Sequence, residues 1–170
     1  SDEAMMALCW LRLWLTGRAR SRRLPADLSN VSLTGRAAVL VAAWQEEQVI
    51  GHTLRHALSV WEQEDLFLYV GCYANDPATI AAAMAGSGGD GRVRLVVHAA
   101  CGPTTKADCL NRLYAAVCDD ERRSGIRFRS VVLHDSEDMV HCAELAVIDR
   151  ALDDADFVQL PVRPEPQVTS

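Results

Sequence analysis

The feature that most constrains the fold is a regular alternation of short apolar runs with segments of helical periodicity. The apolar runs, which read as strands, lie at 37–43, 66–70, 93–98, 128–134 and 157–162. The segments 46–61, 76–84, 105–118 and 143–152 carry apolar residues three and four positions apart, which predicts helices. Short, continuously apolar strands are typical of a sheet that is covered on both faces. The pattern therefore predicts an α/β domain with a mostly parallel sheet and helices on both faces.

Sheets of this class bind ligands at the carboxyl ends of their strands. This rule selects four segments as candidate sites, namely 44–47, 71–76, 99–106 and 135–138. The glycine-rich segment Gly86–Gly91 is a poor candidate, because it precedes a strand instead of joining a strand to a helix. We interpret it as a surface turn.

Three acidic residues, Asp135, Glu137 and Asp138, follow the apolar run 131–133. Like charges this close repel one another, and a divalent cation would relieve that repulsion. An extended backbone would point Asp135 and Glu137 to the same side. Hard oxygen ligands of this kind suit Mg²⁺ or Mn²⁺. The alternative is a solvated acidic turn in which Asp138 caps the following helix.

The segment Cys101–Asn111 (CGPTTKADCLN) joins a predicted strand to a predicted helix. Thr104 or Thr105 would cap that helix, and Lys106 lies in its first turn. Free backbone N–H groups, the helix dipole and an ammonium group together favour an anion such as phosphate. The alternative is a capped helix with an exposed lysine.

The other two strand ends are less informative. Glu46 and Glu47 follow Trp44 at the start of a predicted helix, where the helix dipole alone would explain two carboxylates. Asn75 and Asp76 precede Pro77 and either cap a helix or reach a ligand, and capping is the simpler of the two.

Composition limits the partners and the compartment. A chain of 170 residues holds one domain, and its formal net charge of −6 argues against a nucleic-acid partner, which requires a basic face. The six cysteines show neither a CxxC pair nor the spacing of a zinc site, so we expect reduced thiols in a cytosolic protein.

The N-terminal 35 residues differ from the rest of the chain. An apolar segment, Ala4–Leu15, is too short to span a bilayer and is followed by an arginine cluster at 18–23. This order is typical of a juxtamembrane or interfacial helix, and an ordinary amphipathic helix is the alternative. We therefore divide the chain into a helix with a linker (1–35) and an α/β part (36–170). The start at Ser1 indicates an excerpt from a longer chain.

Several segments, in the same order, resemble motifs of the family 2 glycosyltransferases. The segment 43–47 (AWQEE) is similar to the P-x-Y-N-E turn, Lys106–Asn111 (KADCLN) to K-A-G-x-L-N, and Asp135–Asp138 (DSED) to the D-A-D-D metal motif. The segment 157–162 (FVQLPV) resembles the strand that follows. Longer matches, such as YVGCYANDPAT at 69–79, are similar to a bacterial inner-membrane subgroup. The resemblance covers approximately 37–164.

The resemblance implies the donor-binding half of a Rossmann-like GT-A fold, with Mg²⁺ or Mn²⁺ bridging the phosphates of a nucleoside diphosphate sugar. The donor-binding residues that it implies are Ala43, Trp44, Glu46, Asp76, Lys106, Asn111 and Asp135. The metal ligands that it implies are Asp135, Glu137 and Asp138, and the choice between Glu137 and Asp138 stays open. Asp135 would hold the ribose or a metal-bound water.

The resemblance also implies an inverting transfer to a glycan or lipid-linked acceptor, at the cytoplasmic side of the bacterial inner membrane. Gly71–Tyr73 stands where many members have an aspartate pair that reads uracil, so the base is not determined. The general base is expected beyond Ser170, and the fragment alone is expected to be inactive. A nucleotidyltransferase is disfavoured, since 42–47 lacks a glycine-rich loop. The remaining alternative is a non-catalytic nucleotide-binding or membrane-docking module.

Overall fold

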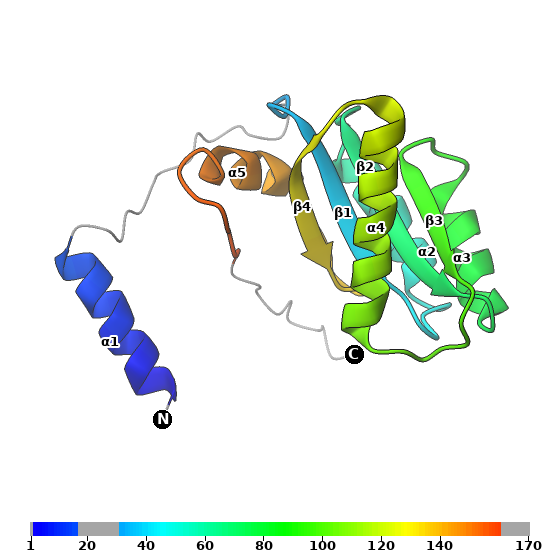
Figure 1. The fold of residues 1–170 in the computed structure, drawn as a ribbon, viewed down its shortest axis with the longest axis horizontal. Coiled ribbons are helices and arrows are strands. Elements are labelled where there is room, and N and C mark those ends of the chain that lie inside the picture. Colours follow the sequence, from blue (N-terminus) through cyan, green and yellow to red (C-terminus); the bar gives the residue numbers. More distant parts are fainter. Residues whose placement is uncertain (1, 17–30, 161–170) are drawn as a thin grey trace, which may run out of the picture.

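The computed structural model describes residues 2–16 and 31–160 (Figure 1). Nine elements follow one another in the described chain, beginning with a helix and then alternating between strand and helix. They are α1 (Asp2–Leu15), β1 (Arg36–Ala42), α2 (Ile50–Val60), β2 (Leu66–Tyr73), α3 (Pro77–Ser87), β3 (Val93–His98), α4 (Lys106–Ser124), β4 (Phe128–His134) and α5 (Glu144–Ala151).

The four strands form one parallel sheet in the order β3-β2-β1-β4. Strand β1 pairs with both β2 and β4, so the strand order reverses beside it. Figure 1 shows α4 across one face of this sheet, with α2 and α3 on the other face. The structure confirms the predicted α/β class and the Rossmann-like arrangement with helices on both faces.

The core explains why β1 reads as a continuous apolar run. Val39 and Val41 pack with α2, α3 and the start of α5 on one face, and Leu40 packs against α4 on the other. Successive side chains of a strand point to opposite faces, so a strand that is buried on both sides has no polar positions. Trp61, which caps the C-terminus of α2, is fully buried and anchors that layer.

Three helix boundaries differ from the sequence prediction. Helix α3 runs to Ser87 instead of Met84, so the predicted surface turn begins at Gly88 and the buried Gly86 belongs to the helix. Helix α2 begins at Ile50, not at Glu46, because the preceding residues form a turn whose backbone is held by neighbouring elements. Helix α4 runs to Ser124 instead of ending near Cys118, and Gly125 terminates it in the left-handed region, with φ of 70°. Glycine tolerates this conformation, which makes it a common C-terminal residue of helices.

The predicted strand at 157–162 is wrong for the part that the structure describes. Residues 157–160 have no regular structure and pair with no described strand, and Phe157 is 81% exposed. Positions 161 and 162 lie outside the described residues. A strand needs a neighbouring backbone to pair with, and an apolar pattern alone does not supply one.

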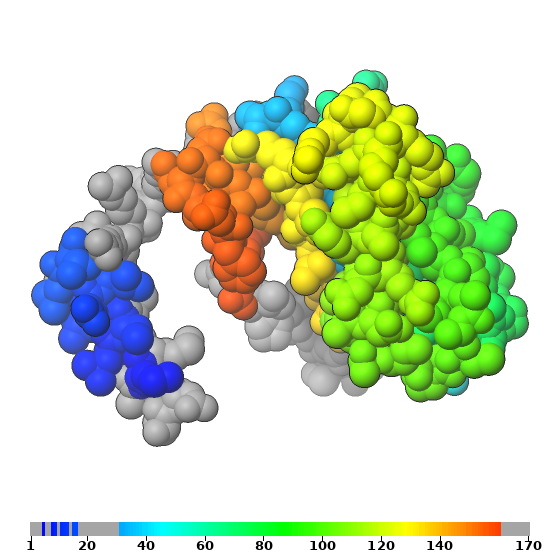
Figure 2. Space-filling model, in the orientation of Figure 1, coloured from blue at the N-terminus to red at the C-terminus, as the bar shows by residue number. Residues whose placement is uncertain are grey.

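Helix α1 confirms the predicted N-terminal helix and lies apart from the sheet, as the ribbon in Figure 1 and the space-filling view in Figure 2 show. Its described apolar side chains are exposed; they are Met5, Leu8, Leu11, Leu13 and Leu15. Within the described ranges, no helix is both long enough and apolar enough to cross a bilayer. The arginine cluster at 18–23 and most of the predicted linker lie outside the described residues, so the division at position 35 remains a prediction.

Candidate functional site

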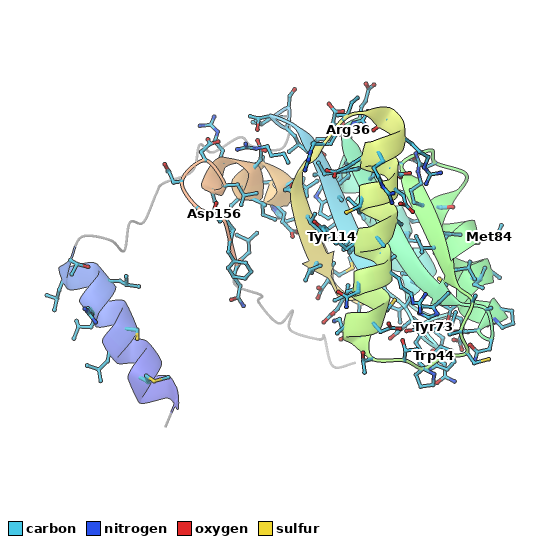
Figure 3. All side chains as sticks on the ribbon, viewed as in Figure 1. Arg36, Trp44, Tyr73, Met84, Tyr114 and Asp156 are labelled. Atoms are coloured by element: carbon cyan, nitrogen blue, oxygen red, sulfur yellow. The ribbon has the colours of Figure 1, made fainter. Side chains whose placement is uncertain are left out.

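A cleft of about 330 Å³ opens at the carboxyl ends of β1, β2 and β4, beside the point where the strand order reverses. This is the position at which open α/β sheets bind their ligands. In Figure 3, Trp44 and Tyr73 mark this end of the sheet, and Arg36 marks the opposite end. The cleft is lined by Ala42, Ala43, Trp44, Glu46, Tyr73, Pro103, Thr104, Lys106, Cys109, Asp135, Ser136 and Glu137.

The turn that carries Trp44 and Glu46 is held by the start of α3. The backbone N–H of Gln45, a residue with the positive φ of 56°, donates to Asp76 Oδ2 at 2.7 Å. The next N–H, of Glu46, donates to Thr79 Oγ1 at 3.0 Å. Positive φ is costly for a residue other than glycine and persists only where the surroundings impose it. The start of α3 therefore fixes the direction in which the Trp44 turn faces.

Asp76 serves this turn and its own helix together. Its Oδ1 accepts the N–H of Thr79 at 3.3 Å, so it is the N-cap of α3. Burial disfavours the charged carboxylate, but the hydrogen bonds from Gln45 and Thr79 outweigh that effect and hold the pKa of Asp76 below its usual value. The capping alternative for Asp76 is confirmed, and its carboxylate does not line the cleft.

An aromatic wall forms one side of the cleft. The ring of Trp44 meets that of Tyr73 edge-on, with centroids 5.2 Å apart, and Tyr73 Oη hydrogen-bonds Thr104 Oγ1 at 2.7 Å. Asn75 accepts from the N–H of Gly102 and donates to its carbonyl, at 2.8 and 3.1 Å. A Cβ at position 102 would lie 2.6 Å from the Trp44 ring, so the loop contacts this wall directly.

The opposite walls carry opposite charges. Thr105 caps α4 by accepting the N–H of Asp108 at 3.1 Å, which places Lys106 at the start of the helix. The ammonium of Lys106 pairs across the cleft with the carboxylate of Asp135, and both side chains are more than half exposed. A cation, a helix N-terminus and a carboxylate therefore face the same space.

The acidic loop after β4 divides its three carboxylates between two sides. Asp135 and Glu137 line the cleft. Asp138 does not, because its Oδ2 accepts the N–H of Asp135 at 2.9 Å and lies 3.3 Å from His134 Nδ1. His134 Nε2 in turn lies 2.7 Å from Glu144 Oε1. Burial disfavours the imidazolium, but Glu144 and Asp138 outweigh it and raise the pKa of His134.

The cleft thus gathers most of the predicted residues but not all of them. Five of the seven predicted donor-binding residues line it, and Asp76 and Asn111 do not. Among the predicted metal ligands, Asp138 is the one that faces away. Sequence reasoning assigned no role to Tyr73, which lines the cleft. Tyr73 lies in the segment 71–76, just after the second apolar run, so its place at a strand end was a usable signal.

The residues of the cleft are compatible with a shared divalent cation. Among the described residues, no three His, Cys, Asp or Glu side chains come together as a complete metal cage. Mg²⁺ does not require one, since it commonly takes one or two carboxylates together with waters and substrate phosphates. Asp135 and Glu137 on one wall of an open cleft satisfy that requirement.

The thiols give no indication of redox chemistry. All six cysteines are free, as expected, with Cys72 and Cys109 buried in the core. Burial raises the pKa of the Cys72 thiol to about 12, so it stays protonated at neutral pH.

Comparison with known proteins agrees with this geometry. A family model described as "Glycosyltransferase like family 2" matches residues 35–165. The chain is 36% identical over 127 residues to bacteriophage adsorption protein B of Escherichia coli K12, and equally to bacteriophage N4 adsorption protein B of E. coli O157:H7. The match covers 75% of this chain but 17% of each relative. No solved structure matches. The chain belongs to family 2 of the glycosyltransferases.

Proposed function

We propose that the cleft binds the nucleoside diphosphate of a nucleotide sugar and that this chain is the donor-binding part of a sugar transferase. One observation carries the proposal: Lys106, Asp135 and Glu137 line the same cleft, beside an aromatic wall and at the point where the strand order of the sheet reverses. A diphosphate needs cationic partners, a base needs an apolar surface, and a divalent metal needs carboxylates. The cleft offers all three.

Each wall then has a role. Trp44, Ala43 and Glu46 receive the base and ribose, and Lys106 with the N-terminus of α4 attracts the phosphates. Asp135 and Glu137 hold Mg²⁺ or Mn²⁺, which when bound neutralises charge on the departing diphosphate.

Two of the predicted residues act differently. Asp76 acts on the donor through the Trp44 turn, which it holds, and Asp138 acts through the backbone of Asp135. Asn111 is exposed on α4 and lines no wall of the cleft, so we give it no role in donor binding.

The acceptor side of the reaction is part of the same proposal. An inverting displacement needs a general base to deprotonate the acceptor hydroxyl, and we assign no residue of this chain to that task. We propose that the acceptor is a glycan or a lipid-linked sugar, and that the domain works on the cytoplasmic side of the bacterial inner membrane. The exposed apolar side chains of α1 and the arginine-rich sequence after it support membrane contact.

The test is titration calorimetry of the 170-residue chain with uridine, guanosine, adenosine and cytidine diphosphates, each with and without Mn²⁺. We expect saturable binding of at least one diphosphate, weakened at least tenfold by chelation of the metal. Absence of metal-dependent heat with all four diphosphates would contradict the proposal. Vesicles of anionic and of neutral phospholipid test the membrane contact separately, and we expect sedimentation with the anionic vesicles.

A further inference from the structure

The acidic loop is held from the side of the sheet that α2 covers. Three side chains at α2, Thr53, His56 and Trp61, each hydrogen-bond a backbone carbonyl of the segment 136–141. Thr53 binds the carbonyl of Ser136, the residue that stands in the chain between Asp135 and Glu137, whose carboxylates line the cleft. The Thr53 hydroxyl donates to that carbonyl at 2.7 Å.

This bond is buried and specific. Thr53 and Ser136 are each 6% exposed, so the bond is shielded from solvent. The hydroxyl also lies 3.3 Å from the carbonyl of Val49, one turn earlier on α2. A hydroxyl has only one proton to donate, and the contact with the Ser136 carbonyl is the shorter of the two. The Thr53 hydroxyl therefore donates to Ser136 and not to Val49.

We infer that Thr53 is a positioning residue for the cleft carboxylates of Asp135 and Glu137; the inference rests on the proposed function. These two residues flank Ser136 in the chain, so a shift of the Ser136 carbonyl moves both side chains. Asp138 holds the same loop from its other end through the N–H of Asp135. The loop is therefore fixed both at the N–H of Asp135 and between Asp135 and Glu137, and partners of this kind set the geometry of metal ligands.

The experiment replaces the hydroxyl without changing the shape of the side chain. In Thr53→Val the volume is kept and the donor is lost, and in Thr53→Ser the donor is kept. Mn²⁺ binding to the full 170-residue chain is measured from the loss of the free Mn²⁺ electron paramagnetic resonance signal, with no nucleotide present. We expect Thr53→Val to weaken Mn²⁺ binding about tenfold and Thr53→Ser to stay within about twofold of the wild type.

A matched variant separates positioning from a general loss of stability. His56→Phe keeps a ring of similar size and removes the bond to the carbonyl of Val140, farther along the same loop. We expect it to lower the thermal midpoint at least as much as Thr53→Val does while leaving Mn²⁺ affinity within about twofold. Amide hydrogen exchange at 135–138, measured without metal, should rise in Thr53→Val and not in Thr53→Ser.

The outcomes are distinguishable. Wild-type affinity for Mn²⁺ in Thr53→Val, or an equal loss in His56→Phe, would overturn the positioning role and leave the proposed function intact. If the wild-type chain took up no Mn²⁺ in the absence of nucleotide, Asp135 and Glu137 would not hold the cation on their own, and the positioning role would fall. The proposed function is tested separately, by the metal-dependent binding of a nucleoside diphosphate.

Discussion

The turn after β2 and the loop after β4 end parallel strands at the same edge of the sheet, and each carries an aspartate, yet the two aspartates differ. Asp76 is 7% exposed and accepts hydrogen bonds from the backbone N–H groups of Gln45 and Thr79. Asp135 is exposed and pairs with the flexible Lys106. A carboxylate whose acceptor sites are filled by fixed amides supports structure, whereas one that faces a mobile ammonium is available to a ligand.

The largest effect that tests this comparison is expected from Asp135→Asn. We expect metal-dependent nucleoside diphosphate binding to weaken at least about 100-fold, equivalent to roughly 2.7 kcal/mol, because a neutral amide is a poor ligand for a divalent cation. The free energy of unfolding without ligand should change by less than about 0.5 kcal/mol, since the side chain is exposed. Calorimetry and urea unfolding measure the two quantities. A variant that binds normally would show that this aspartate is not a ligand.

The opposite pattern is expected from Asp76→Ala. Losing the N-cap of α3 and leaving the Gln45 N–H without its acceptor should lower the free energy of unfolding by about 2 kcal/mol. Nucleotide affinity should fall only severalfold, through a less well held Trp44 turn. Urea unfolding measures the first effect and calorimetry the second. If Asp76→Ala were fully stable but unable to bind, Asp76 would be a ligand and the comparison would be wrong.

The smallest expected effect is on how the free energy of unfolding falls at low pH. The pKa of Asp76 is lowered in the folded chain, so its contribution to stability is fully present above the unfolded value of about 3.9. That contribution is lost as the pH falls through the lower folded value. Urea unfolding between pH 6 and pH 3 should therefore show a steeper decline below about pH 4 in the wild type than in Asp76→Asn. Identical slopes would mean that the hydrogen bonds of Asp76 do not depend on its charge.

Prediction from the sequence succeeded where the signal is local. The four strands that pair in the sheet are recognisable as apolar runs, and the order of Trp44, Lys106 and Asp135 along the chain pointed to one edge of the sheet. It failed where the answer depends on a distant partner. Nothing near Asp76 in the sequence shows that its carboxylate accepts the N–H of Gln45, 31 positions earlier, and residues 157–160 read as a strand without having a neighbour to pair with.

The sequence by itself determined the α/β class and the parallel sheet, because burial on both faces demands apolar strands and chirality dictates the crossovers. It also determined that carboxylates follow β4. Only the tertiary structure decided which of them face the cleft and which side chain holds their loop. Thr53 and Ser136 are separated by 83 positions, and their contact exists because α2 lies beside the loop that follows β4. A contact between residues so far apart in the chain leaves no periodic pattern in the sequence, whereas the burial of a strand does.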